Sequence, residues 1–252
     1  MTKVEGDRIA KCIARAGLCS RREAERWIVA GRVAVDGQTL DSPAFNVLPG
    51  VRVTVDGNPL PAAAPTRVWR FHKPAGAITT NHDPQGRQTI FDLLSSDLPR
   101  VITVGRLDFN SEGLLLLTND GEIARRLEHP ETGWRRRYRV RVHGAVDEDR
   151  LASLNRGVTV DGIRYGQIEA RLEREQRANA WLSVSLNEGK NREVKRVCEH
   201  LGLQVTRLIR VSYGPFQLGN LLRGKIVEVP GKTLAEQIGG GKRRPQRAHH
   251  RG

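Results

Sequence analysis

The first part of the chain places apolar residues at the spacing of an α-helix. Ile9 and Ile13 lie one turn apart, and the helix that they predict ends at Gly17. Ser20 then begins a second helix, because its hydroxyl can accept a hydrogen bond from the first turn while Glu23 reaches back three residues later. The pattern therefore predicts a hairpin of two short helices.

Strand-like alternation follows these helices. Valines alternate with other residues up to Asp36-Gly37, and the same pattern recurs up to Asp56-Gly57. Asp-Gly pairs are typical of two-residue hairpin turns, because both positions tolerate a positive φ. Residues 1–57 are therefore predicted to form one compact domain of helices and short strands.

Proline and charge mark the boundaries in the rest of the chain. Residues 58–66 contain three prolines and no charged side chain, which is typical of a semi-rigid linker. From residue 232 onward the chain is rich in Gly and Arg, and Glu236 is its only acidic residue. We expect residues 232–252 to form a disordered basic tail, since this composition cannot bury a core. Residues 67–231 remain as the large domain.

The large domain mixes strand and helix patterns. Alternation predicts three strands and helical spacing predicts two helices: strands at 69–72, 137–142 and 181–187, and helices at 119–127 and 194–201. Asn119 is the predicted cap of the first of these helices. Neighbouring strands of this kind predict an α+β fold, with a mixed, largely antiparallel sheet and flanking helices around a central cleft.

The charge of the chain points to a polyanionic partner. The 252 residues carry a formal net charge of +14, which favours nucleic acid or an anionic membrane. No apolar run approaches the roughly 20 residues that a membrane span requires, so nucleic acid is the predicted partner. The three cysteines, Cys12, Cys19 and Cys198, are scattered and form no Cys-x-x-Cys pair, so we expect neither a disulfide framework nor a metal site, and a cytoplasmic location.

One carboxylate stands out as a candidate for chemistry. Asp108 lies two residues after Arg106, at a turn between the apolar runs 101–104 and 114–117, which predict buried strands. A rigid turn in a basic environment suits an ionised nucleophile. The alternative is a turn-capping role. A calcium loop fits poorly, because its twelfth position would be Asn119 where a bidentate Glu is needed.

Five segments in order carry a resemblance to a known family. The chain resembles the pseudouridine synthases in His72-Lys73-Pro74-Ala75-Gly76, in the stretch around Asp108, in Arg137-Tyr138-Arg139-Val140, in 188–196 and in 208–214. Residues 8–37 resemble the S4 RNA-binding domain. This combination is similar to the branch that modifies ribosomal RNA, and Asn191-Arg192-Glu193-Val194 is most similar to the B-type synthases of the large ribosomal subunit.

The resemblance implies a role for each matched residue. Asp108 corresponds to the essential catalytic aspartate, Tyr138 is the candidate ring that stacks on uracil, and Lys195 is the candidate cation that keeps the aspartate ionised. Ile209 and Leu208 are expected to supply an apolar floor. From the residues alone, Tyr138 could equally be a core tyrosine and Lys195 a solvated charge.

Other arginines are candidates for RNA contact. Arg106 could bind a phosphate or fill the space that an extruded uridine leaves, although a structural salt bridge is an equal alternative. In the S4-like helix, basic side chains suited to the RNA backbone lie away from the apolar face: Arg21, Arg22 and Arg26.

The sequence thus predicts a monomeric, cofactor-independent RNA pseudouridine synthase that acts on ribosomal RNA, most similar to enzymes of the large subunit. Two alternatives belong to other classes. The first is a non-catalytic S4-type assembly factor, which the intact Asp108, Tyr138 and Lys195 disfavour. The second is a nucleoside glycosidase, which would use paired carboxylates, and Asp108 has no second acid in the matched motifs.

Overall fold

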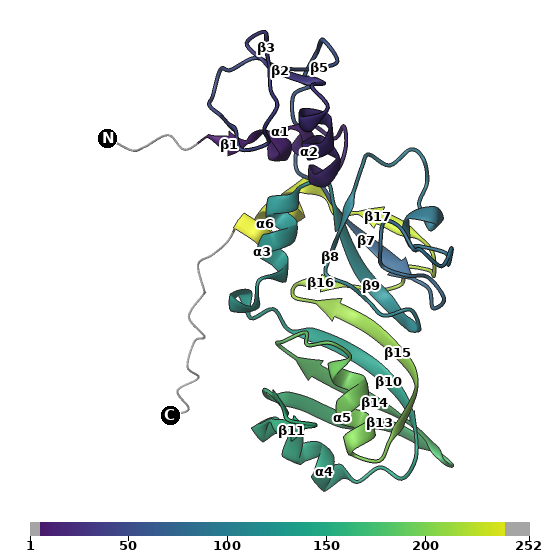
Figure 1. The fold of residues 1–252 in the computed structure, drawn as a ribbon. Coiled ribbons are helices and arrows are strands. Elements are labelled where there is room, and N and C mark those ends of the chain that lie inside the picture. The colour runs from purple at the N-terminus through teal and green to yellow at the C-terminus, as the bar shows by residue number, and fades with distance from the viewer. Residues whose placement is uncertain (1–5, 240–252) are drawn as a thin grey trace, which may run out of the picture. The chain divides into compact units, whose positions relative to one another are not determined.

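The computed structural model describes residues 6–239, and these form two compact units (Figure 1). The first unit contains residues 6–66 together with 95–102 and 118–124, and the second contains 67–94, 103–117 and the chain from Arg125 onward. The α+β content and the mixed sheet agree with the sequence-based prediction. None of the helices between residues 6 and 239 is long and apolar enough to span a bilayer.

The first unit packs two helices against short strands. Its sheet has the order β3-β2-β5-β6, and β1 pairs with β4. Both predicted Asp-Gly turns form, and all four of their residues have a positive φ. The elements are α1 (Ile9–Arg15), α2 (Arg21–Val29), β1 (Asp7–Arg8), β2 (Val33–Val35), β3 (Gln38–Thr39), β4 (Asn46–Val47), β5 (Val53–Val55) and β6 (Asn58–Pro59).

Local details of this unit differ from the prediction. Ser20 caps α2 as expected, with its hydroxyl accepting from the Glu23 amide at 3.1 Å. The Glu23 carboxylate does not reach back, because it pairs instead with Arg26 and accepts from the Trp27 indole at 3.0 Å. The predicted linker also begins too early, since Asn58 and the next residue pair with β5 and Leu60 packs on the core.

The second unit is built on a nine-stranded sheet with the path β13-β14-β10-β15-β9-β7-β17, to which β16 and β8 add. The β15–β9 pair is parallel and the β13–β14, β14–β10 and β10–β15 pairs are antiparallel. Its nine strands are β7 (Val68–Lys73), β8 (Ile102–Val104), β9 (Ser111–Thr118), β10 (Arg136–His143), β13 (Ile168–Gln176), β14 (Asn179–Leu186), β15 (Gln204–Tyr213), β16 (Phe216–Gln217) and β17 (Ile226–Glu228). Strands β11 (Val158–Val160) and β12 (Ile163–Tyr165) form a separate two-stranded sheet.

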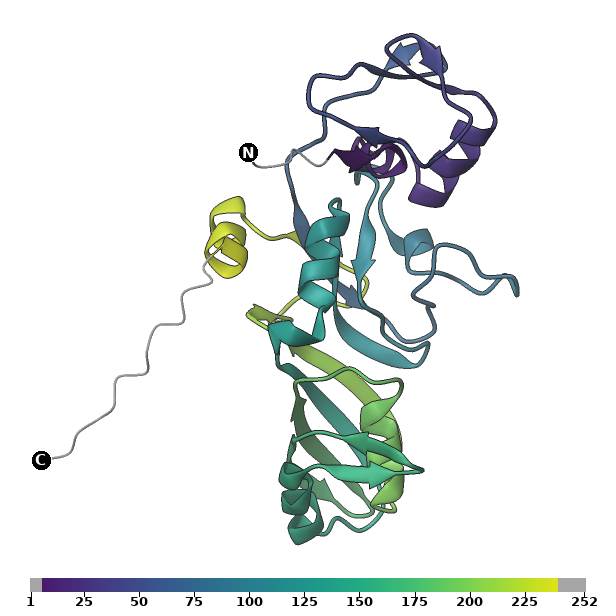
Figure 2. The same cartoon turned by 60° about the vertical axis from the view of Figure 1, so that its left-hand side comes forward.

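Helices α4 (Glu148–Ser153) and α5 (Glu193–His200) cover one face of this sheet (Figure 2). Leu151 of α4 and Val197 of α5 face Leu182 and Val184 of β14 across the same apolar interior. The opposite strand positions point away from these helices, as the alternation of buried and exposed residues along β10 shows.

Two further predictions about helices were wrong. Helix α3 (Gly121–Glu128) is capped by Asp120 and not by Asn119, because the Asp120 carboxylate accepts from the Glu122 amide at 2.9 Å. The segment expected to be a disordered tail begins with helix α6 (Gly231–Gly239), which buries Leu234 and Ile238 one turn apart. Residues 240–252 of that predicted tail lie outside the described residues.

Candidate active site

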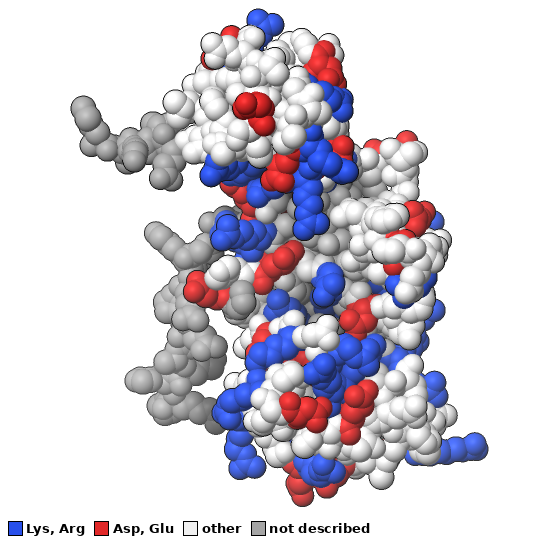
Figure 3. Space-filling view, in the orientation of Figure 1, with Lys and Arg blue, Asp and Glu red and all other residues white. Residues whose placement is uncertain are grey.

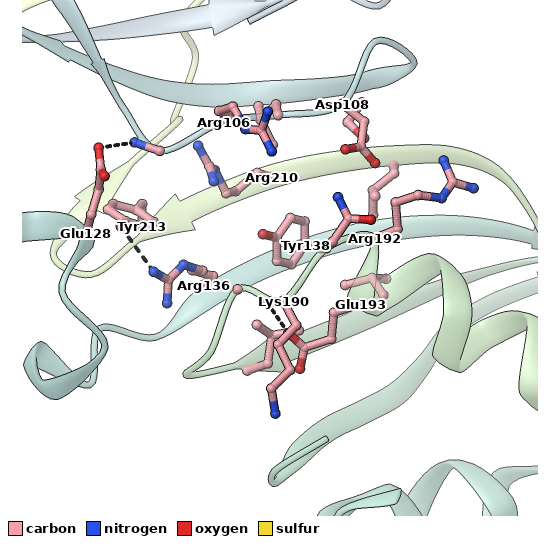
Figure 4. Close-up of a pocket in the computed structure, with 18 of the residues that line it drawn as sticks. Arg106, Asp108, Glu128, Arg136, Tyr138, Lys190, Arg192, Glu193, Arg210 and Tyr213 are labelled. Carbon is pink, nitrogen blue, oxygen red and sulfur yellow. Dashed lines mark hydrogen bonds between the residues drawn. The ribbon is translucent and has the colours of Figure 1, made fainter. Parts of the chain in front are cut away.

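A pocket of about 520 Å³ opens in the second unit (Figure 4). Its walls come from the turn between β8 and β9, from β10, from the segment before α5 and from β15. Asp108 and Arg106 enter from the turn, Tyr138 from β10 and Arg210 from β15. On the face drawn in Figure 3, Lys and Arg side chains gather around α5, with acidic side chains among them.

The turn that carries Asp108 is fixed by hydrogen bonds from the chain after β7. The Thr79 hydroxyl donates to the Leu107 carbonyl at 2.8 Å, and the Gly76 amide donates to the Phe109 carbonyl at 2.9 Å. Within the turn, the Ser111 amide donates to the Asp108 carbonyl at 3.0 Å. These bonds hold the carboxylate in a defined position, as a catalytic group requires.

Asp108 and Lys195 form an ion pair in this pocket region. The Lys195 Nζ lies 3.4 Å from Asp108 Oδ2, and the two side chains are 11% and 36% exposed. Lys195 comes from the first turn of α5, beside the apolar residues that pack this helix on the sheet. The structure therefore brings together two residues that are far apart in the sequence and that sequence analysis paired.

Of the other site residues predicted in the second unit, all but Ile209 line the pocket. Tyr138 and Arg106 both line the pocket, Tyr138 as a nearly buried residue and Arg106 as an exposed one. Ile209 does not line it, and that prediction was wrong. Its neighbours in β15, Leu208 and Arg210, face the pocket, so Ile209 points to the other side of the sheet.

Two family models match this chain, and together they cover most of the residues described above. The family model described as RNA pseudouridylate synthase matches residues 67–200, and the S4 domain model matches residues 7–53. This chain belongs to the RNA pseudouridine synthase family.

Similar proteins extend the match to most of the chain. An uncharacterised RNA pseudouridine synthase of Rickettsia prowazekii is 45% identical over 231 residues, covering 92% of this chain and 97% of the relative. The ribosomal large subunit pseudouridine synthase B of Salmonella typhi is 41% identical, covering 91% and 86%. A crystal structure of a pseudouridylate synthase has the same fold, with a TM-score of 0.64 at 24% identity over 92% of this chain and 99% of that one.

Two inward-facing arginines of the synthase were missed from its sequence. Arg136 and Arg210 lie 4.7 and 5.0 Å from the ring centre of Tyr213, and all three residues line the pocket. The Arg210 Nε donates to the Leu114 carbonyl at 2.7 Å, whereas its buried Nη2 has no hydrogen-bond partner among the described residues. The only signal was Arg210 between Leu208 and Ser212, and it is weak because the same strand also carries Gln204, Thr206 and Arg207.

Gly113 permits the close approach of β9 to Arg210 of β15. Its φ of +102° suits glycine, and a Cβ at this position would collide with the backbone of Arg210. Strands β9 and β15 therefore approach closely where the pocket floor forms.

A buried acid, Glu193, also lines the pocket. Burial raises the pKa of Glu193 to about 7, and the carboxylate accepts from the Lys190 amide at 2.9 Å. The Lys190 side chain forms an ion pair with Glu188, with 2.6 Å between Nζ and Oε2. Arg192 precedes the helix with a φ of +52°, which shapes the bend of this segment. This bend brings the Lys190 amide to Glu193 and sends the Lys190 ammonium group away from Asp108.

Lys73 is a further residue that the motif contained but sequence analysis did not assign. The side chain is fully buried, and its Nζ donates to the carbonyls of Pro74, Phe109 and Ser111 at 3.0, 3.2 and 2.9 Å. Burial lowers the pKa of Lys73 to about 8, while Asp108 opposes that shift. The ammonium group thus anchors the turn that carries Asp108.

Replacing Lys73 with Met is expected to lower the free energy of unfolding by about 1–3 kcal/mol at pH 7, because buried carbonyls lose their donor. The lowered pKa means that the folded synthase binds fewer protons here than the unfolded chain between pH 8 and 10.5. The stability of the wild type relative to the Met variant should therefore rise with pH across that window. Urea unfolding measures both effects, with Lys225→Met as the exposed control.

The synthase offers no cluster of three metal-binding side chains among residues 6–239. Its three cysteines are free thiols. In the first unit, the three arginines predicted to contact RNA all lie exposed on α2: Arg21, Arg22 and Arg26. Of these, Arg26 is paired with Glu23.

Proposed function

We propose that this synthase converts a uridine of large-subunit ribosomal RNA to pseudouridine in the cytoplasm. The observation that carries the proposal is the Asp108–Lys195 ion pair at a pocket lined by several arginines. The names of relatives from Salmonella typhi and Haemophilus influenzae, at 41% and 43% identity, support the choice of the large subunit. We propose that the synthase acts as a monomer.

The reaction breaks the N1–C1′ bond of uridine, turns the base and joins C5 to C1′. Asp108 is the catalytic residue, acting as nucleophile at C1′, as base at C2′ or by addition at C6. Lys195 places its positive charge next to this carboxylate, with Nζ 3.4 Å from Asp108 Oδ2. Tyr138 presents its ring to the uracil and its hydroxyl to the proton at C5.

The arginines of the pocket are proposed to bind RNA and not to take part in the isomerisation itself. A uridine in folded RNA must leave its stack before its C1′ can be reached, and this costs a few kcal/mol. Arg106 is placed to bind a flanking phosphate or to fill the vacated stack, since it is exposed and lies two residues from Asp108. The buried Arg210 adds a positive charge to the lining of the same pocket.

Release of tritium from RNA labelled at uridine C5 tests the proposed function directly. We expect release when the protein acts on transcripts of the large-subunit RNA and little release from small-subunit transcripts. Release from the small-subunit RNA alone would overturn the substrate assignment, and release from neither would overturn the proposed activity. An RNA-binding protein without catalysis would retain affinity and release no tritium.

The S4 segment, residues 1–57, is proposed to set the affinity for RNA. Residues 67–231 are proposed to perform the isomerisation, and the basic segment from residue 232 is proposed to add weaker contacts with RNA. Deleting the S4 segment is a poor test, because Arg15 pairs with Asp120, at 3.3 Å, within the first unit. We therefore expect Arg22→Gln to weaken binding of a large-subunit rRNA fragment and to reduce the slope of log affinity against log salt by about one.

The matched control for this prediction is Arg52→Gln, which removes an exposed charge of the same unit outside α2. Fluorescence anisotropy at several salt concentrations measures affinity, and single-turnover rates at saturating RNA should stay close to wild type. Equal effects of both substitutions on the salt slope would contradict the role given to α2.

A further inference from the structure

The face of the catalytic sheet that α4 and α5 leave uncovered carries a regular array of arginines. On β10, Arg137, Arg139 and Arg141 are exposed and alternate with buried residues. Successive members of this series lie about 7 Å apart along the strand. They point away from the pocket, because Arg136 and Tyr138 at the intervening positions face it.

Strand register extends the array across neighbouring strands. Arg139 is level with Ser183 of β14, which is level with Arg171 of β13. Arg141 is flanked by Trp181 of β14 and, on its other side, by an arginine of β15. These rows cross four strands: β13, β10 and β15 carry the basic side chains, and β14 contributes Ser183 and Trp181.

Acidic side chains compensate only part of this charge. Seven arginines belong to the outer face, and three of them have a glutamate partner: Arg135 with Glu169, Arg139 with Glu173 and Arg207 with Glu112. The other four form no salt bridge with any described residue: Arg137, Arg141, Arg171 and Arg174. The face therefore keeps an excess of positive charge, and Glu112 also pairs with a second arginine, Arg223, at 3.1 Å.

A hollow of about 440 Å³ lies within this face. Arg137 and Arg171 line it together with hydroxyl groups of Ser183 and Ser185, and Glu169, the one acid of the lining, is paired with Arg135. The Arg137 side chain is held in place, since it donates to the Ser212 hydroxyl at 3.0 Å and to Gln217 at 2.7 Å. Its guanidinium is therefore positioned before any ligand arrives.

An aromatic ring lies beside the hollow. The half-buried Trp181 has the guanidinium groups of Arg139 and Arg207 at 4.9 and 6.0 Å from its ring centre. Evenly spaced guanidinium groups, hydroxyl donors and an aromatic surface are the side chains with which proteins hold a nucleic-acid strand.

We propose that this outer face is a second RNA-binding surface, which binds the phosphate backbone of a segment of RNA outside the catalytic pocket. The proposal rests on the proposed function only for the kind of RNA. Charge complementarity favours a polyanion, and the serine-lined hollow with the regular arginine spacing favours phosphates over the carboxylates of an acidic protein.

The test compares two doubly substituted full-length proteins. Arg137→Gln with Arg171→Gln removes two charges from the hollow, and Arg156→Gln with Arg177→Gln removes two exposed charges elsewhere in the second unit. The probe is a labelled duplex of guanosine and cytidine, which contains no uridine. Unchanged circular dichroism spectra and thermal midpoints establish that both proteins are folded.

The outer-face variant should reduce the slope of log affinity against log salt by about 2, so that its loss of affinity is about tenfold larger at 50 mM than at 200 mM salt. The control should change the slope by much less. Equal changes in both proteins would overturn the proposal, and so would competition by polyglutamate as strong as by unlabelled RNA. Failure of the proposed function would appear separately, as absent tritium release from ribosomal RNA by the wild type.

Discussion

Asp108→Asn should abolish isomerisation while the protein stays folded and binds RNA. The amide has the same shape but is neither a nucleophile nor a base, and it no longer forms the ion pair with Lys195. The backbone bonds that fix the turn use main-chain atoms of residue 108 and its neighbours, so they survive the substitution. We expect the single-turnover rate at saturating RNA to fall by at least about 10⁴-fold, or about 5 kcal/mol of barrier.

Tritium release under single-turnover conditions measures this loss, and binding to the same RNA measures affinity. Asp149→Asn in α4 is the matched control, because it makes the same chemical change at an exposed position. Substantial turnover by the Asp108→Asn protein would show that another group performs the chemistry.

Lys195→Ala is expected to have the second largest effect. Lys195 is the cation in contact with Asp108, and removing it leaves the carboxylate without its partner at 3.4 Å. Loss of one electrostatic contact of this kind costs about 10²–10³ in rate. Lys195→Arg should retain more activity than Lys195→Ala, because it keeps the charge.

Lys190→Ala serves as the control for this prediction. Lys190 also lines the pocket, but its ammonium group pairs with Glu188 at 2.6 Å and donates to the Arg164 carbonyl at 2.6 Å. Its removal should change the single-turnover rate little. Small and equal effects of both alanine variants would mean that Lys195 is not the site cation.

Motifs made the Asp108–Lys195 pair predictable from the sequence. Asp108 lies in a turn between two apolar runs, and Lys195 lies on the flank of a helix whose apolar face is clear. Both signals are local, and the order of the motifs then places them in one site. The α+β fold and most strands followed in the same way from alternation and Asp-Gly turns.

The side of a strand on which a residue lies was harder to predict. The family resemblance implied an apolar floor from Ile209 and Leu208, which are adjacent in β15 and therefore point to opposite sides of the sheet. In the structure Ile209 is only partly buried, while Leu208 and Arg210 are buried on the pocket side. A pattern of apolar and polar residues predicts every arginine to be exposed. Such a pattern therefore could not identify Arg136 and Arg210 as residues of the pocket.

Lys73 and Asp120 show a related limit. Both are polar residues whose role depends on backbone groups elsewhere in the fold, the carbonyls of the Asp108 turn for Lys73 and the amides of α3 for Asp120. Asn119 and Asp120 are both good helix caps by residue type, and only the path of the chain decides between them.

The anchoring of the Asp108 turn has a consequence for evolution and engineering. Every bond described above that fixes the turn comes from residues 73–79 or from the turn itself, so the position of Asp108 depends on no contact with the S4 segment that is described above. We therefore expect that the RNA-binding part can be exchanged without displacing Asp108. Because Lys11 and Arg15 pair with acids at 120–122, a working chimera should carry residues 118–124 along with the first 66.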